Sequence, residues 1–314
     1  MDGVALNVDL RLGVDLGGTK SEILALDAIT GAELYRRRVP TERSYDGVLR
    51  SIGELVESAE RELRRSGTVG VGIPGTVSTV TGLVKNANST WIIGKPLDQD
   101  LARVLGRPVR VENDANCFAI SEATDGAAAG ARVVFGVILG SGTGGGVVVD
   151  GKPLRGVNGI GGEWGHNPLP WPRVLEDGSD ERPGPACYCG KTGCIETWLS
   201  GPGLEADYRS AGGSRRTAKE VAEVAELGEQ LAQIVLARYA DRLARGLAQV
   251  INVLDPDVIV LGGGVGNIAR LYRDVPSIWQ RYVFSDSVLT VLKPPVHGDS
   301  SGVRGAAWLW SRSF

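Results

Sequence analysis

The sequence predicts an α/β protein with two domains that repeat one structural pattern. Short apolar runs rich in β-branched residues alternate with segments of helical periodicity along most of the 314 residues. A strand that ends in a glycine hairpin and returns as a second strand occurs twice, near residue 15 and again near residue 140. A chain of this length can bury two cores of domain size. We therefore expect two α/β halves, each opened by a glycine hairpin.

The first hairpin is expected from a strand over 12–16, a Gly-Gly-Thr turn over 17–19 and a second strand over 21–27. Nucleotide motifs of the Walker and dinucleotide types place a helix after their glycines, and neither spacing is present here. Successive backbone N–H groups of a hairpin can still hold phosphate, with the Thr19 hydroxyl beside them and Asp15 as a carboxylate for hydrated Mg²⁺. A tight turn without a ligand is the alternative for this motif taken alone.

The central stretch of the first half is Glu-Asn-Asp-Ala-Asn at 112–116, between a strand-like run and a segment over 115–129 that favours a helix. Asp114 is therefore expected at a strand-to-helix corner, where a carboxylate can accept a proton from a hydroxyl group. The alternative is that Asp114 only caps the helix, because Asp and Asn accept hydrogen bonds from the first helical N–H groups. The remaining elements expected in this half are strands over 33–40, 68–73 and 109–111 and helices over 45–66 and 97–105.

The second half repeats the opening pattern. A strand over 132–139, glycines over 140–146 and a strand over 147–150 predict another hairpin of the same kind. Two copies indicate a duplicated protein whose halves face each other across a cleft. The elements expected after this hairpin are a long helix over 229–253, a strand over 258–261 followed by three glycines, and a last helix over 303–310.

Three of the four cysteines, Cys187, Cys189 and Cys194, form a C-x-C-x₄-C motif, and His166 lies upstream of them. Three thiolates and one imidazole are a typical ligand set for a closed, structural Zn²⁺ site. Free or disulfide-bonded cysteines are the alternative, although an odd cluster of three cannot pair completely. We expect the fourth, Cys117, to be a small buried residue.

Composition narrows the classes of partner. A net charge of -3 offers no basic excess for nucleic acid. No apolar run approaches the roughly 20 residues that span a bilayer, and we expect a cytoplasmic protein. The polar, Pro- and Gly-rich segment 172–186 is expected to be a surface loop, with a lid as the alternative.

Six motifs follow one another along the chain: DLGGT at 15–19, NDAN at 113–116, the glycines at 140–146, EWGH at 163–166, CYCGKTGCIE at 187–196 and GGGV at 262–265. In this order they resemble the sugar kinases of the ROK group (repressors, open reading frames, kinases), which have the actin-like, ribonuclease-H-like ATPase fold. The resemblance covers nearly the whole chain. It implies a smaller N-terminal α/β domain over 1–125 plus 300–314 and a larger C-terminal α/β domain over 126–299, which carries the zinc site and the helices of a homodimer.

The resemblance also implies an ATP-dependent kinase in which Asp114 accepts the proton of a sugar hydroxyl. The two hairpins and Mg²⁺ would hold the ATP phosphates, and the glycines after the strand over 258–261 would approach the adenosine. The implied ATP-binding residues are Asp15, Gly17, Gly18, Thr19, Lys20, Gly140, Gly142, Thr143, Gly144, Gly145, Gly263 and Gly264. The implied sugar-binding residues are Gly75, Asn88, Asn113, Asp114, Glu163, His166 and Glu196, with His166 also a zinc ligand.

The stretches 84–91, 165–171 and 298–305 look closest to bacterial fructokinases (manno-fructokinases), which predicts phosphorylation of fructose to fructose 6-phosphate and also of mannose. N-acetylglucosamine kinases share the Asp, Glu and zinc residues, so that alternative stays open. A sugar-responsive regulator without catalysis is a further alternative. Repressors of this family carry a helix-turn-helix domain before the first hairpin, and we expect no room for one here.

Overall fold

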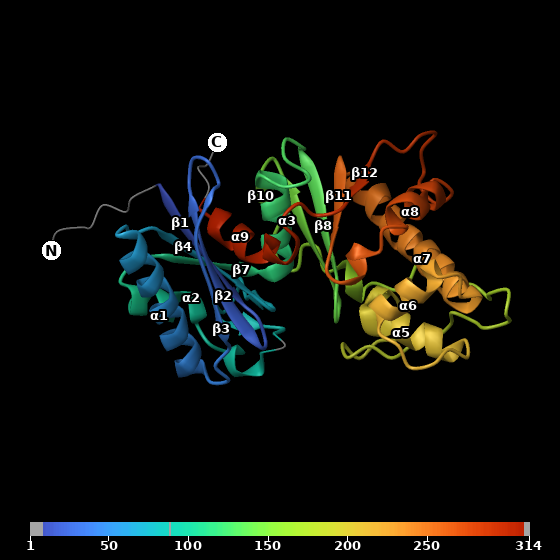
Figure 1. Ribbon diagram of the computed structural model, residues 1–314, viewed down its shortest axis with the longest axis horizontal. Coiled ribbons are helices and arrows are strands. Elements are labelled where there is room, and N and C mark those ends of the chain that lie inside the picture. Colours follow the sequence, from blue (N-terminus) through green and yellow to red (C-terminus); the bar gives the residue numbers. More distant parts are fainter. Residues whose placement is uncertain (1–8, 88, 311–314) are drawn as a thin grey trace. The chain divides into compact units, whose positions relative to one another are not determined.

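The computed structural model describes residues 9–87 and 89–310, which group into two compact units (Figure 1). The first unit comprises 1–129, 151–161 and 299–314, and the second comprises 130–150 and 162–298. The division into functional domains that the resemblance implies, one over 1–125 and 300–314 and the other over 126–299, stays a prediction.

The first unit is built on a five-stranded sheet with the order β3-β2-β1-β4-β7. β1 pairs antiparallel with β2 and parallel with β4, and β4 pairs parallel with β7. The bounds of its elements are β1 (Leu10–Leu16), β2 (Lys20–Asp27), β3 (Glu33–Pro40), α1 (Tyr45–Leu63), β4 (Thr68–Ile73), β5 (Thr76–Val77), β6 (Val84–Lys85), η1 (Thr90–Ile92), α2 (Leu97–Leu105), β7 (Val109–Asn113), α3 (Asp114–Thr124), β10 (Lys152–Pro153), η4 (Gly298–Ser300) and α9 (Ser301–Trp308).

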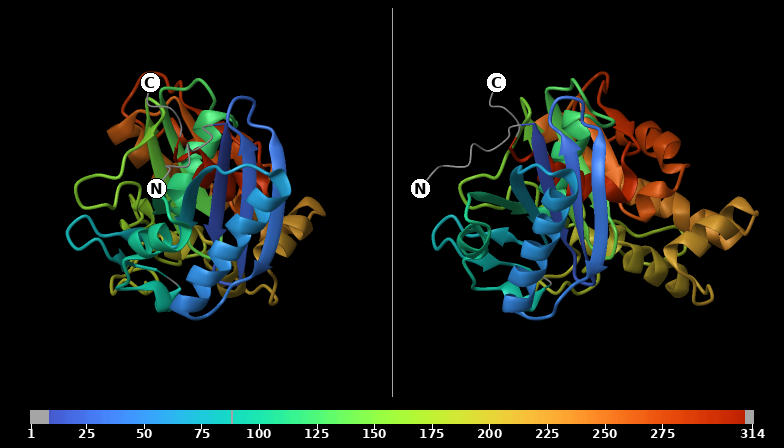
Figure 2. Two further views of the ribbon diagram at one scale, coloured as in Figure 1. Left: turned by 90° about the vertical axis from the view of Figure 1, so that its left-hand side faces the viewer. Right: turned by 60° about the vertical axis from the view of Figure 1, so that its left-hand side comes forward.

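Strand alternation gives this sheet two different faces. Even-numbered residues of β1, among them Leu12 and Val14, belong to one buried cluster with the apolar face of α1. Figure 2 shows the blue helix α1 along one face of the blue strands. The opposite face carries glycines, because α9 lies against it at backbone distance. A Cβ atom added at Gly13 would lie 2.1 Å from the Val303 carbonyl oxygen, and one at Gly70 would lie 1.9 Å from that of Ala306. The close approach of α9 therefore depends on these glycines.

The second sheet has the order β10-β9-β8-β11-β12. β8 pairs antiparallel with β9 and parallel with β11, and β11 pairs parallel with β12. This is the topology of the first sheet, so the duplication expected from the two hairpins is confirmed in the sheet order. The bounds of the second unit's elements are β8 (Val133–Leu139), β9 (Thr143–Val149), η2 (Trp164–His166), α4 (Ile195–Leu199), α5 (Gly201–Ser210), α6 (Ala218–Glu226), α7 (Gln230–Leu254), β11 (Val258–Gly262), η3 (Val265–Asn267), α8 (Leu271–Trp279) and β12 (Val291–Lys293).

Several predicted boundaries need correction. The helix expected over 45–66 ends at Leu63, because Arg64 adopts the left-handed conformation and donates its N–H to the Glu60 carbonyl. The strand expected over 147–150 begins earlier, at Thr143, since its glycines continue the antiparallel register with β8. The helix expected over 115–129 begins at Asp114 and ends at Thr124.

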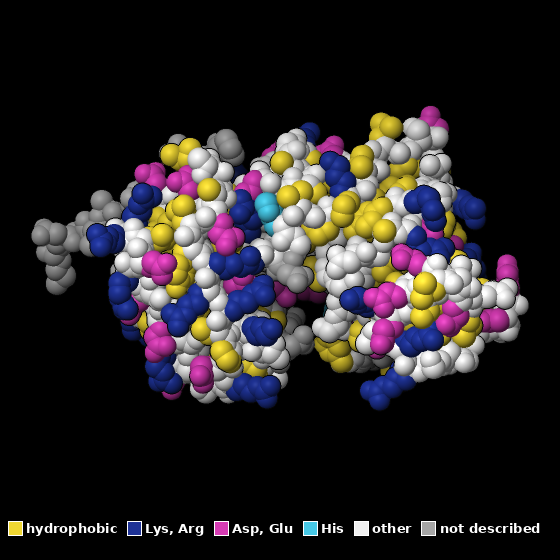
Figure 3. Space-filling view, in the orientation of Figure 1, with side chains coloured by type: hydrophobic (Ala, Val, Ile, Leu, Met, Phe, Trp, Pro, Cys, Tyr) yellow, Lys and Arg dark blue, Asp and Glu magenta, His cyan; other side chains and the backbone are white. Residues whose placement is uncertain are grey.

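Basic and acidic side chains lie intermixed on the face of the molecule drawn in Figure 3. Within 9–87 and 89–310, no helix is both long enough and apolar enough to cross a lipid bilayer.

Replacement of Gly305 by alanine should destabilise the first unit, because the added Cβ would lie 1.6 Å from the backbone carbonyl oxygen of Cys117 in α3. Overpacking of this kind should lower Tm by at least about 5 °C in thermal unfolding. Gly302→Ala is the matched control, since its Cβ would meet only the Asp15 carboxyl group, at 3.9 Å. Equal Tm values for the two variants would contradict the close packing of α9 on α3.

Candidate active site and metal centre

The β1–β2 hairpin is held in place through its carbonyl groups. Gly17 donates its N–H to the Lys20 carbonyl at 3.1 Å, and Thr41 donates its N–H to the Thr19 carbonyl at 3.0 Å. The Thr41 hydroxyl also donates to the Gly17 carbonyl at 2.8 Å. Gly18, Thr19 and Lys20 are exposed, and a Cβ added at Gly18 would meet nothing within 4 Å. This geometry fits a turn that presents backbone to a ligand. Sequence reasoning missed Thr41, which no motif distinguishes.

Asp15 lies on β1, two residues before this hairpin. Burial, together with the negative charges of Asp114 and Glu22, raises the pKa of its carboxyl group to about 7. The positive charge of Arg38, which forms an ion pair with Glu22 at 2.7 Å, lowers it. Asp15 and Asp114, which are 99 positions apart in the sequence by subtraction of their numbers, therefore interact electrostatically. A divalent cation at such a pair would relieve the repulsion.

The corner between β7 and α3 shows which residue caps the helix. Asn113 is the N-cap, and its side-chain oxygen accepts from the N–H groups of Ala115 at 2.9 Å and Asn116 at 3.3 Å. Asp114 is the first residue of the helix, where its Oδ1 accepts from the Ala115 N–H at 2.8 Å. Capping is thus performed mainly by the neighbour of Asp114. The helix N-terminus favours the ionised form of a carboxyl group placed there.

Two further contacts orient this corner. The Asn113 Nδ2 donates to the Gly75 carbonyl at 3.0 Å, so the structure brings these two predicted sugar-binding residues together. Glu112, whose side chain is buried, accepts from the Asn113 N–H at 2.9 Å and forms an ion pair with Arg155. Sequence reasoning missed this pair, because Arg155 is far away in the sequence and lies in no motif. Asn88, another predicted sugar-binding residue, lies outside the described residues.

The β8–β9 hairpin has a different set of partners. Gly140 donates its N–H to the Gly142 carbonyl at 2.9 Å, and Thr143 donates its N–H to Glu196 Oε2 at 3.0 Å. The Thr143 hydroxyl is buried and has no hydrogen-bond partner within the part of the chain that the structure describes. Gly145 packs closely against the Phe135 ring, which would lie 2.8 Å from an added Cβ.

The other glycines predicted to bind ATP in the second unit, Gly144, Gly263 and Gly264, differ in what lies next to them. The Gly144 carbonyl accepts from the Trp164 indole N–H at 3.0 Å. Gly263 has a φ of +80° and lies against the end of β8, where an added Cβ would be 2.4 Å from the Leu139 carbonyl oxygen. A Cβ added at Gly264 would meet nothing within 4 Å. The chain thus brings the turn after β11 next to the second hairpin, with Gly264 as its open position.

His166, Cys187, Cys189 and Cys194 form one cluster, in which the candidate ligand atoms all lie within 4.8 Å of one another. The Cys189 and Cys194 sulfurs are 3.7 Å apart, and the His166 Nδ1 is 3.6 Å from the Cys187 sulfur. At Zn–S distances of about 2.3 Å and Zn–N distances of about 2.0–2.1 Å, a tetrahedron separates two sulfurs by about 3.8 Å and a sulfur from a nitrogen by about 3.6 Å. The donor set and its spacing therefore fit a tetrahedral Zn²⁺ ion.

Glu196 connects this cluster to the second hairpin. One of its carboxylate oxygens accepts from the Thr143 N–H, and the other lies 3.9 Å from the Cys187 sulfur. Glu163 is exposed and precedes the short helix η2, which contains His166. The second ring nitrogen of His166 lies 3.1 Å from the Tyr188 hydroxyl. Sequence reasoning missed Tyr188, although its place between two ligand cysteines could have indicated it.

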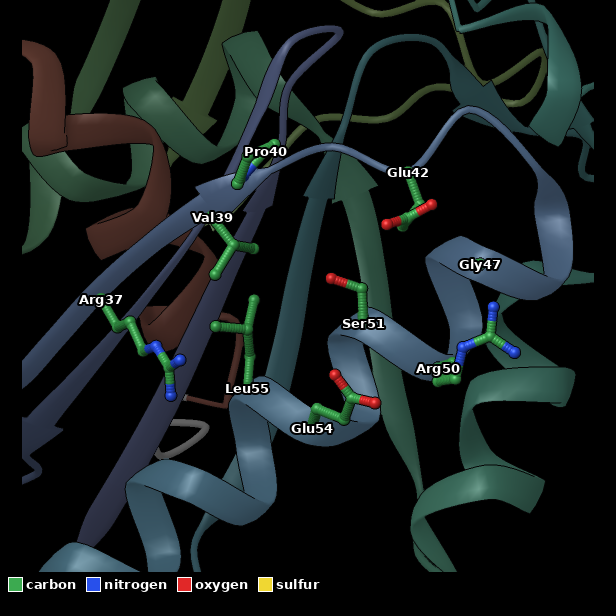
Figure 4. Close-up of a pocket in the computed structure, with 9 residues that line it drawn as sticks. All are labelled: Arg37, Val39, Pro40, Glu42, Gly47, Arg50, Ser51, Glu54 and Leu55. Atoms are coloured by element: carbon green, nitrogen blue, oxygen red, sulfur yellow. The ribbon is translucent and has the colours of Figure 1, made fainter.

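The predicted site residues fall into two groups, one in each compact unit. The first unit holds Asp15, the first hairpin, Gly75, Asn113 and Asp114, and the second unit holds the others that are described. A pocket of about 270 Å³ in the first unit lies between β3 and α1 and contains none of the predicted residues (Figure 4). Its lining residues are Arg37, Val39, Pro40, Glu42, Gly47, Arg50, Ser51, Glu54 and Leu55.

Comparison with known proteins agrees with the motifs. The model of the ROK family matches residues 11–313. The chain belongs to the ROK family. It is 40% identical to the N-acetyl-D-glucosamine kinase of Pectobacterium atrosepticum over 298 residues, which cover 95% of this chain and 97% of that protein. It is also 40% identical to the N-acetyl-D-glucosamine kinase of Pasteurella multocida, over 96% of this chain and 99% of that one.

Solved structures place the ROK chain in the same fold. The ROK hexokinase from Thermus thermophilus is 33% identical with a TM-score of 0.82, over 95% of this chain and 96% of that chain. A ROK family glucokinase from Streptomyces griseus, in complex with glucose and AMPPNP, is 28% identical with a TM-score of 0.74, over 96% of this chain and 98% of that chain. The expected α/β fold of the ROK kinases is thus confirmed. The expected preference for fructose is not, since both 40% identical relatives are N-acetyl-D-glucosamine kinases.

Replacement of Asp15 by asparagine should stabilise the protein at pH 8 in the absence of Mg²⁺. The carboxyl pKa is about 7 when folded against an ordinary 3.8, so the folded state binds its proton more tightly and stability falls as pH rises from about 4 to about 7. Asparagine cannot ionise, so Asp15→Asn should gain on the order of a few kcal/mol at pH 8 and less at pH 5.5. Thermal unfolding of both proteins at the two pH values measures this. The same gain at both values would contradict the raised pKa.

Removal of a thiol from the cluster should release the metal and loosen the segments that it joins. Metal analysis should find one Zn²⁺ per wild-type chain and about none in Cys194→Ser, with Tm lowered by several degrees. Cys117→Ala is the control, because this buried cysteine is in the other unit and outside the cluster. Full metal content in Cys194→Ser would show that the cluster is not the binding site.

Proposed function

We propose that this ROK family protein transfers a phosphoryl group from ATP to a hydroxyl of a hexose, with N-acetylglucosamine as the favoured substrate. The observation that carries the catalytic part is the corner at β7–α3, where Asn113 caps the helix and Asp114 occupies its first position. The two N-acetyl-D-glucosamine kinases that are 40% identical over nearly the whole chain support the choice of sugar.

Asp114 is the proposed general base. Phosphoryl transfer requires alignment and charge neutralisation more than covalent chemistry, so a base has only to accept the hydroxyl proton as the bond forms. The Asn113 cap, the Glu112 contact to the Asn113 N–H and the Asn113 contact to Gly75 fix the backbone that carries this carboxylate. Closure of the site on the sugar would exclude water around Asp114.

The proposed nucleotide site uses both hairpins. Exposed backbone at Gly18 and Thr19 would contact phosphate oxygens, and Asp15 would hold a hydrated Mg²⁺, whose charge lowers the pKa of that carboxyl group. The buried Thr143 hydroxyl and the open position at Gly264 offer further contacts from the second unit. Lys20 is exposed at the start of β2 and would contribute a positive charge.

The proposed sugar site combines Gly75, Asn113 and Asp114 with Glu163, His166 and Glu196. A Zn²⁺ ion at the cluster would be structural, and His166 would bind it through Nδ1, which faces Cys187. The metal would fix the backbone on either side of Glu163 and Glu196, so that their carboxylates keep one geometry toward sugar hydroxyls. A homodimer and a cytoplasmic location stay expectations from the resemblance.

A coupled ADP-release assay with Mg-ATP should identify the substrate. N-acetylglucosamine should give the highest kcat/KM in a set that includes fructose, mannose, glucose and N-acetylmannosamine. A preference for fructose would keep the mechanism and restore the specificity expected from the motifs. No turnover with any of these sugars would contradict the proposed activity and favour a regulator.

Replacement of Asp114 by asparagine should lower kcat about 10²–10⁴-fold and leave the sugar KM within a few-fold, because the general base is lost while the contacts to the sugar remain. Asp46→Asn is the matched control, since Asp46 is an exposed carboxylate in the first turn of α1 in the same unit. Near-normal turnover of Asp114→Asn would refute the assignment of the base.

A further inference from the structure

The segment 172–186, expected to be a surface loop with a lid as the alternative, is joined to α7 by buried ion pairs. Glu181 is at its centre, and its side chain is only 1% exposed. The Glu181 Oε1 accepts from Arg242 Nε and from Arg245 Nη2, both at 2.8 Å. Buried charges of this kind persist only when they are paired and hydrogen-bonded. A lid that opens would have to separate these ions, so the segment is a fixed part of the second unit.

Arg245 has contacts that Arg242 does not make. Its side chain is fully buried, with an exposed fraction of 0%, and its Nη1 donates to the carbonyl of Pro170 at 2.8 Å and to that of Trp171 at 2.9 Å. Its Nε also donates to Asp241 Oδ2 at 2.9 Å. One guanidinium therefore holds Glu181 and the two carbonyls that end the stretch beginning at His166.

The backbone at the second of these carbonyls, that of Trp171, is strained. Trp171 has a φ of +47°, a left-handed conformation that is uncommon for a residue with a large side chain. Such a conformation is energetically unfavourable and persists when its surroundings fix it. The surroundings here are the Arg245 guanidinium on the carbonyl and the Tyr282 ring, which stacks on the Trp171 indole at 5.2 Å between centroids.

The backbone at Pro170 and Trp171 is connected to the cysteine cluster through two nearby hydrogen bonds. Leu169 donates its N–H to the Gly193 carbonyl at 2.9 Å, and Ile195 donates its N–H to the Asn167 carbonyl at 2.8 Å. These bonds connect the stretch after His166 to the stretch that holds Cys194 and Glu196. Displacement of the Trp171 carbonyl would therefore shift both stretches together.

We propose that Arg245 is a positioning residue for the sugar-contacting segment: its contacts to the Pro170 and Trp171 carbonyls set the placement of His166 and Glu196. This inference rests on the proposed function, because it takes Glu163, His166 and Glu196 as the groups that meet the sugar. Arg245 itself touches none of these side chains in the contacts that the structure gives. Its effect passes through the backbone of 167–171.

Arg242 is the matched control that the chain offers. It lies one helical turn earlier on α7, has a side chain that is 2% exposed and donates to the same Glu181 oxygen at the same distance. Its other contacts are to Asp207 Oδ2 at 2.8 Å and to the ring of Trp198 in α4 at 4.4 Å, and in the contacts that the structure gives none is to the backbone of 167–171. If both arginines only stabilise the fold, their removal should change the sugar KM and the rate of Zn²⁺ release equally. If Arg245 positions the segment, its removal should change both quantities more than removal of Arg242.

The test compares the variants Arg245→Met and Arg242→Met at a temperature well below the Tm of both. The measured quantities are kcat and KM for the sugar and for ATP, and the rate of Zn²⁺ release to a chromophoric chelator. Arg245→Met should raise the sugar KM and the release rate by about tenfold each, with a smaller change in kcat. Arg242→Met should change both by less than about threefold despite a comparable fall in Tm. Equal effects of the two substitutions on KM and release would overturn the inference.

A second variant keeps the test decisive if Arg245→Met does not fold. Arg245→Lys keeps the charge beside Glu181, but its single ammonium group cannot replace a guanidinium fork that reaches two carbonyls and two carboxylates. It should show the same rise in KM and release rate, and wild-type values would contradict positioning. Absence of sugar turnover in the wild-type protein would instead refute the proposed function, and the release rates would still decide the role of Arg245.

Discussion

The meeting of one imidazole and three thiols in the second unit is the constraint on which the proposed sugar-contacting segment depends. Two separations within it, 3.6 Å between His166 Nδ1 and the Cys187 sulfur and 3.7 Å between the Cys189 and Cys194 sulfurs, match edges of a zinc tetrahedron, so the cluster suits a Zn²⁺ ion. The cluster joins a stretch around residue 166 to one around residue 190, neither of which has much regular structure of its own. Glu196 follows directly and accepts from the Thr143 N–H, which ties the cluster to the second hairpin. Glu196 thus connects the cysteine cluster to the hairpin of the proposed phosphate site, and Arg245 of α7 contacts the backbone after His166.

In the first unit, the carboxylates of Asp15 and Asp114 lie close enough to interact electrostatically. Asp15 lies near the end of β1 and Asp114 begins α3, and burial, together with the negative charges of Asp114 and Glu22, raises the pKa of Asp15 to about 7. Such a pair contributes nothing to stability, because two like charges that are partly buried oppose folding. In the proposed function, a cation beside the pair would relieve this repulsion and serve phosphoryl transfer. Raised pKa values at paired carboxylates are typical of functional sites for this reason.

Much of the fold could be predicted from the sequence, because its signals are local. The α2 bounds and the β3 and β4 bounds follow from apolar periodicity, and the two hairpins follow from their glycines. The cysteine cluster was predictable from ligand type and spacing. Contacts between distant stretches could not be predicted, because they depend on tertiary packing. Examples are the contacts of Thr41 with the first hairpin, of Arg155 with Glu112 and of Arg245 with the Trp171 carbonyl. No motif surrounds Thr41, Arg155 or Arg245 in the sequence. The choice of sugar could not be predicted either, since N-acetylglucosamine kinases and fructokinases resemble each other in the Asp, Glu and zinc residues of the motifs.

The proposed mechanism requires Asp114 to lie against the hydroxyl that receives the phosphoryl group. A crystal structure of the protein with Zn²⁺, N-acetylglucosamine and a non-hydrolysable ATP analogue with Mg²⁺ would show whether it does. An Asp114 carboxylate oxygen is expected within about 2.6–3.2 Å of one sugar hydroxyl, with the terminal phosphate of the analogue on that hydroxyl's other side. A sugar bound with every hydroxyl remote from Asp114, or a phosphate chain away from both hairpins, would contradict it.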